Sequence, residues 1–164
     1  MNGFLIGRFQ PFHLGHLEAI NFALSKIDQL YIGIGSSNKS NQPRNPFNAE
    51  ERKQMIVTSL NENILKRVSI YEIPDLDDHS KWTKSIDEII PNYDVVFSND
   101  DFTRSLYEKR HIKVVPVVLK TREELSGTNI REKILTNNNW ESLVPDGTRN
   151  VLLEINARSR LEQL

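Results

Sequence analysis

Several features that would narrow the function are missing from this chain of 164 residues. It has no cysteine, which excludes disulfides, iron–sulfur clusters, thiolate zinc sites and a cysteine nucleophile, and fits a reducing cytosol. Its 21 Lys and Arg nearly balance its 22 Asp and Glu, so no overall basic field favours nucleic acid or an anionic membrane. An anionic ligand must therefore be held by a local cluster of residues.

Long hydrophobic runs are also missing. The longest, residues 114–119, contains Pro116 and is far shorter than the roughly 20 residues of a membrane-spanning helix. The N-terminus lacks the basic segment and apolar core of a signal peptide. We therefore expect a cytoplasmic protein without a membrane or nucleic-acid partner. The length and the 38% hydrophobic content fit one ordinary globular domain.

Short apolar runs alternate with segments of helical spacing along residues 1–119. Runs rich in Ile, Val and Tyr predict strands, and the spacing of apolar residues between them predicts helices. This alternation predicts an α/β, Rossmann-like doubly wound sheet of five parallel strands, with the proline-containing last strand at an edge or bulge. The expected strands are 3–6, 30–34, 68–73, 93–97 and 112–119, and the expected helices are 14–27, 49–60, 82–90 and 101–110.

Two segments break this alternation. Residues 120–164 predict a helical C-terminal part, with helices over 129–135 and 147–164, that completes a single domain spanning 1–164. Residues 36–46 are polar and rich in Ser, Asn and Pro, a loop long enough to suspect a function. Before the second helix, Asn48 and Glu51 form a candidate capping box.

The segment after the first strand carries the most chemistry. Residues 7–16, Gly-Arg-Phe-Gln-Pro-Phe-His-Leu-Gly-His, open the first helix at the sheet edge where open α/β sheets bind ligands. His13 and His16 share one face of the first turn, where imidazoles with an ordinary pKa near 6.5 would be kept protonated by a phosphate. Two other interpretations remain: solvated or backbone-paired loop histidines, and a metal pair, although no third ligand accompanies them.

A second segment with similar chemistry follows the last strand. Residues 124–131, Glu-Leu-Ser-Gly-Thr-Asn-Ile-Arg, open another helix, for which Ser126 and Thr128 are candidate caps. The free N–H groups of that helix start and Arg131 would donate to a triphosphate. Alone, the segment is better interpreted as an ordinary helix start with a surface arginine.

Together these segments resemble a known superfamily. Residues 7–16 are similar to the G-x-F-x-P-x-H-x-G-H signature of the HxGH nucleotidylyltransferases, and residues 126–131 to their S-x-T-x-[IV]-R signature. These enzymes transfer a nucleotidyl group from a nucleoside triphosphate to a phosphate and release pyrophosphate. The resemblance implies that His13, His16, Arg8 and Arg131 are catalytic and stabilise the triphosphate. The ATP-binding residues that it implies are Ile6, Gly7, Phe9, Gln10, Gly15, Asn99, Ser126, Gly127, Thr128 and Ile130.

Over its whole length the chain resembles the archaeal type of nicotinamide-nucleotide adenylyltransferase, most clearly at residues 8–13 and 44–52. This resemblance implies ATP and nicotinamide mononucleotide as substrates, Mg2+ bridging the triphosphate, and a homo-oligomer, often a hexamer. It also implies phosphate binding by Arg44 and stacking of Trp82 on nicotinamide. Asn48 replaces the usual Thr as an equally good N-cap. Glu50 replaces the usual Gly and would repel a nearby phosphate.

Several assignments stay open from the residues alone. Trp82 reads equally well as a core tryptophan, Asp77 and Asp78 are expected to be solvated, and Trp140 is expected in the core or a subunit contact. A sister transferase using phosphopantetheine, FMN or a cytidylyl acceptor is one functional alternative. A non-catalytic module that senses NAD or ATP and a purely structural domain are the others. The choice between nicotinamide and nicotinic acid mononucleotide is also open.

Overall fold

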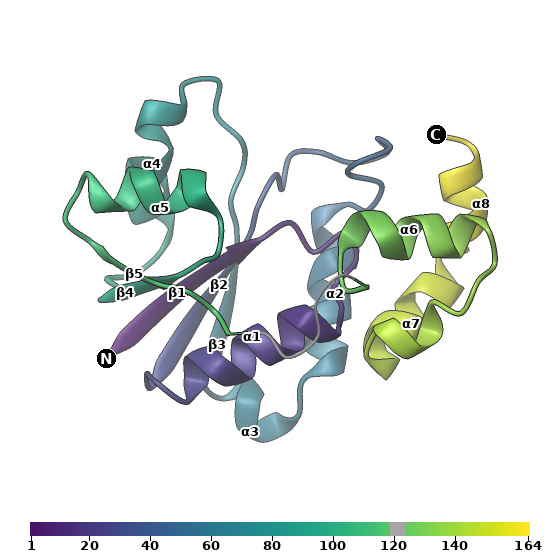
Figure 1. Cartoon of the computed structure of the whole chain (residues 1–164), viewed down its shortest axis with the longest axis horizontal. Helices are drawn as coiled ribbons and strands as arrows, with labels where there is room; N and C mark the ends of the chain where they lie inside the picture. The colour runs from purple at the N-terminus through teal and green to yellow at the C-terminus, as the bar shows by residue number, and fades with distance from the viewer. Residues whose placement is uncertain (119–123) are drawn as a thin grey trace.

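Five parallel strands form one sheet in the computed structural model, which describes residues 1–118 and 124–164 (Figure 1). The order across the sheet is β3-β2-β1-β4-β5, so the predicted parallel sheet is confirmed. The prediction of an edge position for the last strand is also confirmed, although β5 ends at Val115, just before the proline. Residue 119 lies outside the described residues. The strands are β1 (Asn2–Gly7), β2 (Gln29–Ile34), β3 (Val68–Glu72), β4 (Val95–Phe97) and β5 (Lys113–Val115).

Helices cover both faces of the sheet, as a doubly wound fold requires (Figure 1). The predicted helices are present as α1 (Leu14–Leu24), α2 (Ala49–Ser59), α4 (Trp82–Ile89) and α5 (Asp101–Glu108). The periodicity did not predict a short helix, α3 (Glu62–Leu65), or a 3-10 turn, η1 (His79–Lys81). Successive residues of β1 point to opposite faces: Leu5 joins the core built with α1 and α2, whereas Phe4 joins the smaller core built with α4 and α5.

The predicted capping box of α2 is confirmed. Asn48 Oδ1 accepts from Glu51 N at 2.8 Å, and Glu51 Oε1 accepts from Asn48 N at 2.9 Å. The Glu51 carboxylate also pairs with both terminal nitrogens of Arg160, at 2.6 and 2.8 Å. The start of α2, and with it the end of the 36–46 loop, is thereby tied to the C-terminal helices.

The C-terminal helices pack on the α1 and α2 side, to the right of the sheet in Figure 1. They are α6 (Gly127–Leu135), the 3-10 turn η2 (Glu141–Leu143), α7 (Asp146–Glu154) and α8 (Ala157–Glu162). The prediction of one helix over 147–164 is wrong, because Asn156 adopts a left-handed conformation with φ 52° that separates α7 from α8. Trp140, 6% exposed, lies in the shared core.

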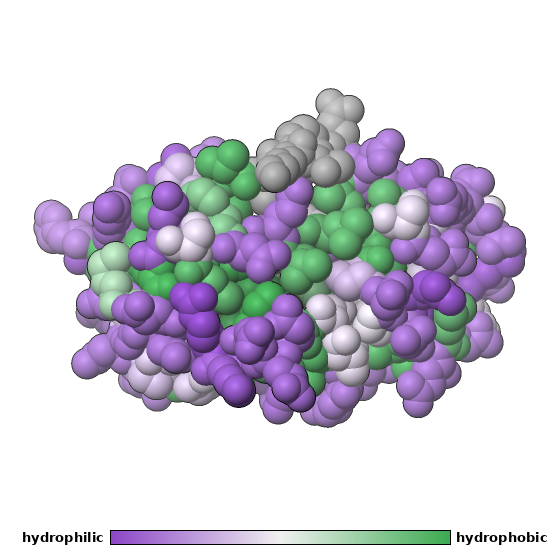
Figure 2. Space-filling view, turned by 90° about the horizontal axis from the view of Figure 1, so that it is seen from below, coloured by the Kyte–Doolittle hydropathy of each residue, from purple (hydrophilic) through white to green (hydrophobic). Residues whose placement is uncertain are grey.

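The surface is largely polar. Figure 2, seen from below Figure 1, shows hydrophobic side chains gathered in the middle of one face and framed by hydrophilic ones. Large hydrophobic side chains that remain exposed include Phe102, Val118 and Leu153. Among the described residues, no helix combines the length and the apolar character needed to cross a membrane.

Candidate active site

Two cavities adjoin the loop at the carboxyl end of β1. One lies where this loop meets the loops after β2, β3 and β4, and the other lies where it meets the start of α6. Their volumes are about 420 and 260 Å3, and Arg8, directly after β1, lines both. The chain runs from β1 to β2 on one side and reaches β4 on the other, so this is the point where the strand order reverses. Open α/β sheets bind ligands at such a point.

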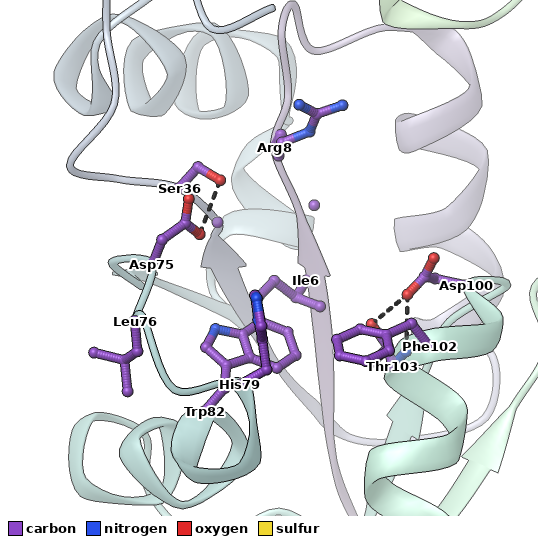
Figure 3. A pocket seen from close by; sticks show the side chains of 12 residues that line it. Ile6, Arg8, Ser36, Asp75, Leu76, His79, Trp82, Asp100, Phe102 and Thr103 are labelled. Carbon is purple, nitrogen blue, oxygen red and sulfur yellow. Dashed lines mark hydrogen bonds between the residues drawn. The ribbon is translucent and has the colours of Figure 1, made fainter.

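The larger cavity combines a cationic end with an aromatic end (Figure 3). Arg8 lies at one end. His79 of η1 and Trp82 at the start of α4 project into the other end. Phe102 of α5 faces them from the opposite wall. On a side wall, Asp75 Oδ1 accepts from Ser36 Oγ at 3.0 Å. The cavity is lined by Ile6, Gly7, Arg8, Gly35, Ser36, Asp75, Leu76, His79, Trp82, Asp100, Phe102 and Thr103.

The smaller cavity, here called the histidine cavity, joins the two sequence motifs. The His13 and His16 rings stack at 3.6 Å between centroids and 22° between planes. The cavity has no carboxylate among its described lining residues, which suits a polyanion. Its lining is Arg8, Phe9, Gln10, His13, His16, Ser126, Gly127, Thr128 and Arg131.

Hydrogen bonds at the start of α1 determine which imidazole nitrogen carries the hydrogen in His13 and His16. His13 is the N-cap of α1, and its Nδ1 accepts from Gly15 N at 3.1 Å. His16 Nδ1 accepts from His13 N, also at 3.1 Å. A neutral imidazole has one donor and one acceptor nitrogen, so Nε2 carries the hydrogen in both rings. Each histidine therefore offers an Nε2–H donor.

Both imidazoles are neutral at pH 7 in the ligand-free protein, so the predicted protonated state would require a bound phosphate. Burial lowers the pKa of His13 to about 4. Burial and the neighbouring His13 hold the pKa of His16 well below its ordinary value. The Phe9 and Phe12 rings pack on the His16 ring, with centroids at 4.8 and 5.6 Å, and help to exclude water. A bound polyphosphate would raise both pKa values.

Arg131 enters the histidine cavity from the first turns of α6. Its Nη1 donates to the Gln10 carbonyl at 2.7 Å, and its side chain is largely buried. Burial, followed by repulsion from Arg8 and Arg44, lowers its pKa, so three arginines gather here. Gly127 allows this approach, since a Cβ there would lie 2.8 Å from Arg131 Nη1 and 2.9 Å from the Gln10 carbonyl oxygen.

Other predicted ligand-binding residues organise the loops. Ser126 is the N-cap of α6 and accepts from Asn129 N at 3.1 Å. The Gln10 amide is paired on both sides with the backbone of Phe47, each bond 3.0 Å long. Gln10 therefore joins the loops after β1 and β2, and it also lines the histidine cavity.

Four predicted ligand contacts do not line either cavity. The Ile130 side chain is fully buried in the core, and Gly15 packs against the His13 ring. The Asn99 amide bonds to the backbone N–H and carbonyl of Val117, at 2.7 and 2.9 Å, and so braces the segment after β5. Arg44 is exposed on its loop beside the arginine cluster.

Glu50 does not approach this site. Its carboxylate accepts from Gln54 Nε2 at 3.2 Å, and it lines a separate cleft toward α7. The repulsion of phosphate expected from its charge therefore does not arise in the two cavities.

Sequence reasoning missed His79 and Phe102 in the larger cavity and Arg52 beside it, and it left Asp75 either as a partner of a ribose hydroxyl or as a solvated acid. Phe102 had a usable signal, because it follows a strand closely on the carboxyl side. Arg52 is completely buried and bonds to both loops of the site. It had no such signal, since an arginine on a helix is normally solvated.

The donor set fits a metal that arrives with its ligand. Within residues 1–118 and 124–164, no three His, Asp or Glu side chains gather in a way that could hold a metal ion. A divalent cation in this site would therefore be coordinated mainly by the phosphates of a nucleotide.

Comparisons with known proteins agree with this geometry. A family model described as cytidylyltransferase-like matches residues 4–133. A Thermoplasma volcanium protein named nicotinamide-nucleotide adenylyltransferase is 40% identical over 98% of this chain and 90% of its own. An Archaeoglobus fulgidus protein of that name is 37% identical, covering 100% of this chain and 97% of its own.

A solved structure extends the comparison. It is a bifunctional NMN adenylyltransferase/ADP ribose pyrophosphatase from Francisella tularensis, complexed with AMP and a manganese ion. The match has a TM-score of 0.85 and 25% identity and covers 99% of this chain but 51% of the other. The family model and the whole-chain relatives lead to the same conclusion: this chain belongs to the cytidylyltransferase-like family.

Proposed function

We propose that this protein transfers AMP from ATP to nicotinamide mononucleotide, forming NAD and pyrophosphate. The whole-chain similarity to proteins named nicotinamide-nucleotide adenylyltransferase supports this overall reaction. The observation in the site that carries it is the stacked histidine pair, whose Nε2–H donors share a cavity with Arg131 and the Ser126–Thr128 segment.

The reaction needs no nucleophile from the protein. A phosphate oxygen of the mononucleotide attacks the α-phosphorus of ATP, the bond from that phosphorus to the β-bridging oxygen breaks, and pyrophosphate leaves. Catalysis then consists mainly of alignment and stabilisation of charge. In this proposal the triphosphate occupies the histidine cavity and the mononucleotide occupies the larger one, so that Arg8 stands between the two reacting phosphates.

The roles of the donors follow from their chemistry. Nε2–H of His13 and of His16 would bond to α- and β-phosphate oxygens, where negative charge develops as the bond breaks. Arg131 would bind the triphosphate, while Arg8 and Arg44 would bind and align the acceptor phosphate. Mg2+ would enter as part of the ATP substrate and bridge its phosphates. The manganese ion in the Francisella structure supports a divalent cation.

The aromatic end of the larger cavity suits the pyridine ring. The indole of Trp82 would stack on the positively charged pyridinium, and Phe102 would close the opposite side. Asp75, held by Ser36, would accept from a ribose hydroxyl. Trp82, which the residues alone left open between stacking and a place in the core, thus has a role in this proposal.

The functional alternatives are less well supported. A sister transferase for phosphopantetheine would have no aromatic ring to place at the aromatic end of the larger cavity. A sensing module would not need His13, His16 and Arg131 together in one cavity.

We also propose that the protein is cytoplasmic and forms a homo-oligomer, and light scattering on the purified protein would test the oligomeric state. The hydrophobic side chains gathered on the face in Figure 2 support association between copies.

The test is pyrophosphate release from MgATP with four acceptors in parallel: nicotinamide mononucleotide, nicotinic acid mononucleotide, FMN and phosphopantetheine. Pyrophosphate release with only the two pyridine mononucleotides supports the proposal, and the two rates show which of them is the better acceptor. The variant His16→Asn retains an acceptor near the Nδ1 position but has no donor at the Nε2 position. It should lower turnover by about 100-fold while ATP affinity changes little. Pyrophosphate release with FMN or phosphopantetheine would show that the proposed acceptor is wrong. Weaker ATP binding by His16→Asn with unchanged turnover would show that the proposed role of the histidine is wrong.

A further inference from the structure

A buried arginine that the reaction above does not use lies next to the site. The Arg52 side chain, on α2, is completely buried, and it forms no ion pair with the carboxylates of the described residues. Burial lowers the pKa of its guanidinium to about 10, so the group remains charged at pH 7. A buried charge is costly unless its N–H groups are hydrogen-bonded.

The Arg52 guanidinium meets this need with backbone carbonyl groups alone. Nε donates to Asn48 at 3.2 Å, Nη1 to Arg8 at 2.9 Å and Gly35 at 2.7 Å, and Nη2 to Ser36 at 3.1 Å and Lys39 at 3.4 Å. These carbonyl groups belong to the loops after β1 and β2 and to the start of α2. One side chain therefore joins the loop that carries Arg8 to the loop that leads to Arg44.

The bond to Arg8 has the most direct consequence. Arg8 lines both cavities, and the Arg52 guanidinium holds the carbonyl of that same residue. The bond to Ser36 acts on the opposite wall, where the Ser36 hydroxyl bonds to Asp75. A shift in either carbonyl would change the distance between the phosphate-binding arginine and the acceptor.

We propose that Arg52 is a positioning residue for adenylyl transfer: it fixes the backbone at Arg8 and Ser36 and so sets where the Arg8 guanidinium stands between the two substrates. This inference rests on the proposed function. A misplacement of about 1 Å at a reacting centre lowers turnover by roughly 100-fold.

The chain supplies a matched control in Arg67. Its guanidinium also donates to backbone carbonyls, of Leu24, Ile27 and Asp28 at 2.8, 2.7 and 3.0 Å. These bonds lie at the amino ends of β2 and β3, the end of the sheet opposite to the site. Arg67→Lys removes comparable bonds without touching the loops of the site.

The experiment measures kcat, the KM for ATP, the KM for nicotinamide mononucleotide and the free energy of unfolding. It compares wild type with Arg52→Lys, Arg52→Gln, Arg67→Lys, Arg8→Met and the double variant Arg52→Lys/Arg8→Met. We expect Arg52→Lys to lower kcat by about 100-fold with an ATP KM within about twofold of wild type. Arg67→Lys should keep its kcat within about twofold. The double variant should be no slower than Arg8→Met alone, since Arg52 acts through Arg8.

Each outcome decides the inference. If the kcat losses of Arg52→Lys and Arg8→Met multiply in the double variant, Arg52 does not act through Arg8 and the inference is wrong. If Arg52→Lys and Arg67→Lys lower kcat equally, Arg52 has only a structural role and the inference is also wrong. If neither Arg52 variant folds, the guanidinium NMR signal of the wild-type protein decides: slow solvent exchange, unchanged by NAD, supports a fixed anchor, whereas fast exchange contradicts it. A wild-type protein that forms no NAD refutes the proposed function instead, which keeps the two failures distinct.

Discussion

The buried neutral histidines should make folding stability depend on pH, and substitution of His13 should reduce this dependence by a calculable amount. The folded-state pKa of His13 is about 4, whereas an unfolded chain would have an ordinary value near 6.5. The unfolded state therefore binds protons more readily below pH 6.5. Stability should fall as the pH drops from about 6.5 to about 4 and should then level off for this group.

The magnitude follows from the two pKa values. At pH 4.5 the difference in proton binding by His13 alone destabilises the fold by about 2.5 kcal/mol relative to pH 7.5. His16, whose pKa is also lowered by burial, adds to this loss in the same direction. This is a large share of the stability of a typical domain, which is about 5 to 15 kcal/mol.

The variant that isolates the effect is His13→Asn. An Asn side-chain oxygen reaches the position of His13 Nδ1 and can cap α1, so stability at pH 7.5 should remain within about 1 kcal/mol of wild type. Urea unfolding followed by circular dichroism from pH 7.5 to 4.5 should then show about 2.5 kcal/mol less acid destabilisation in the variant.

The control is His111→Asn, because His111 is exposed and its left-handed backbone conformation, with φ 58°, suits Asn. This variant should follow the wild-type pH profile. If His13→Asn and wild type lose the same stability between pH 7.5 and 4.5, the argument that burial keeps His13 neutral is refuted.

Three further substitutions test other parts of the structure. Gly127→Ala places a methyl group against Arg131 Nη1 and the Gln10 carbonyl and should lower kcat by about tenfold; unchanged kinetics would contradict that close approach. Trp82→Ala should raise the KM for nicotinamide mononucleotide by about tenfold and leave the ATP KM unchanged, whereas a shift in both would place Trp82 elsewhere. Asn156→Ala should lower the free energy of unfolding by about 1 kcal/mol, with Asn156→Gly near wild type, because alanine disfavours the left-handed conformation; equal stability of both variants would argue against it.

Local patterns in the sequence were sufficient for most of the fold. The apolar runs that become β1 to β4 lie between helical segments, and the Asn48–Glu51 capping box is a contact between near neighbours that sequence spacing reveals. The break at Asn156 escaped prediction, since the apolar residues on both sides keep helical spacing and one left-handed residue leaves little trace in that pattern.

The candidate site, too, could be predicted from the sequence only in part. Both histidines and Arg131 belong to short contiguous motifs, so their residues could be found, but their protonation could not. The neutral state depends on packing by Phe9 and Phe12 and on burial, which spacing does not report. Arg52 was beyond reach for a related reason: its five carbonyl partners come from segments up to 44 residues away.

The central claim is direct adenylyl transfer between two bound substrates, and the fate of the α-phosphorus tests it most directly. The purified protein would be incubated with ATP labelled at the α-phosphorus, with and without nicotinamide mononucleotide. The account predicts label in NAD only when the acceptor is present, unlabelled pyrophosphate, and no label on the protein. Label retained on the protein, or labelled AMP without NAD, would contradict it.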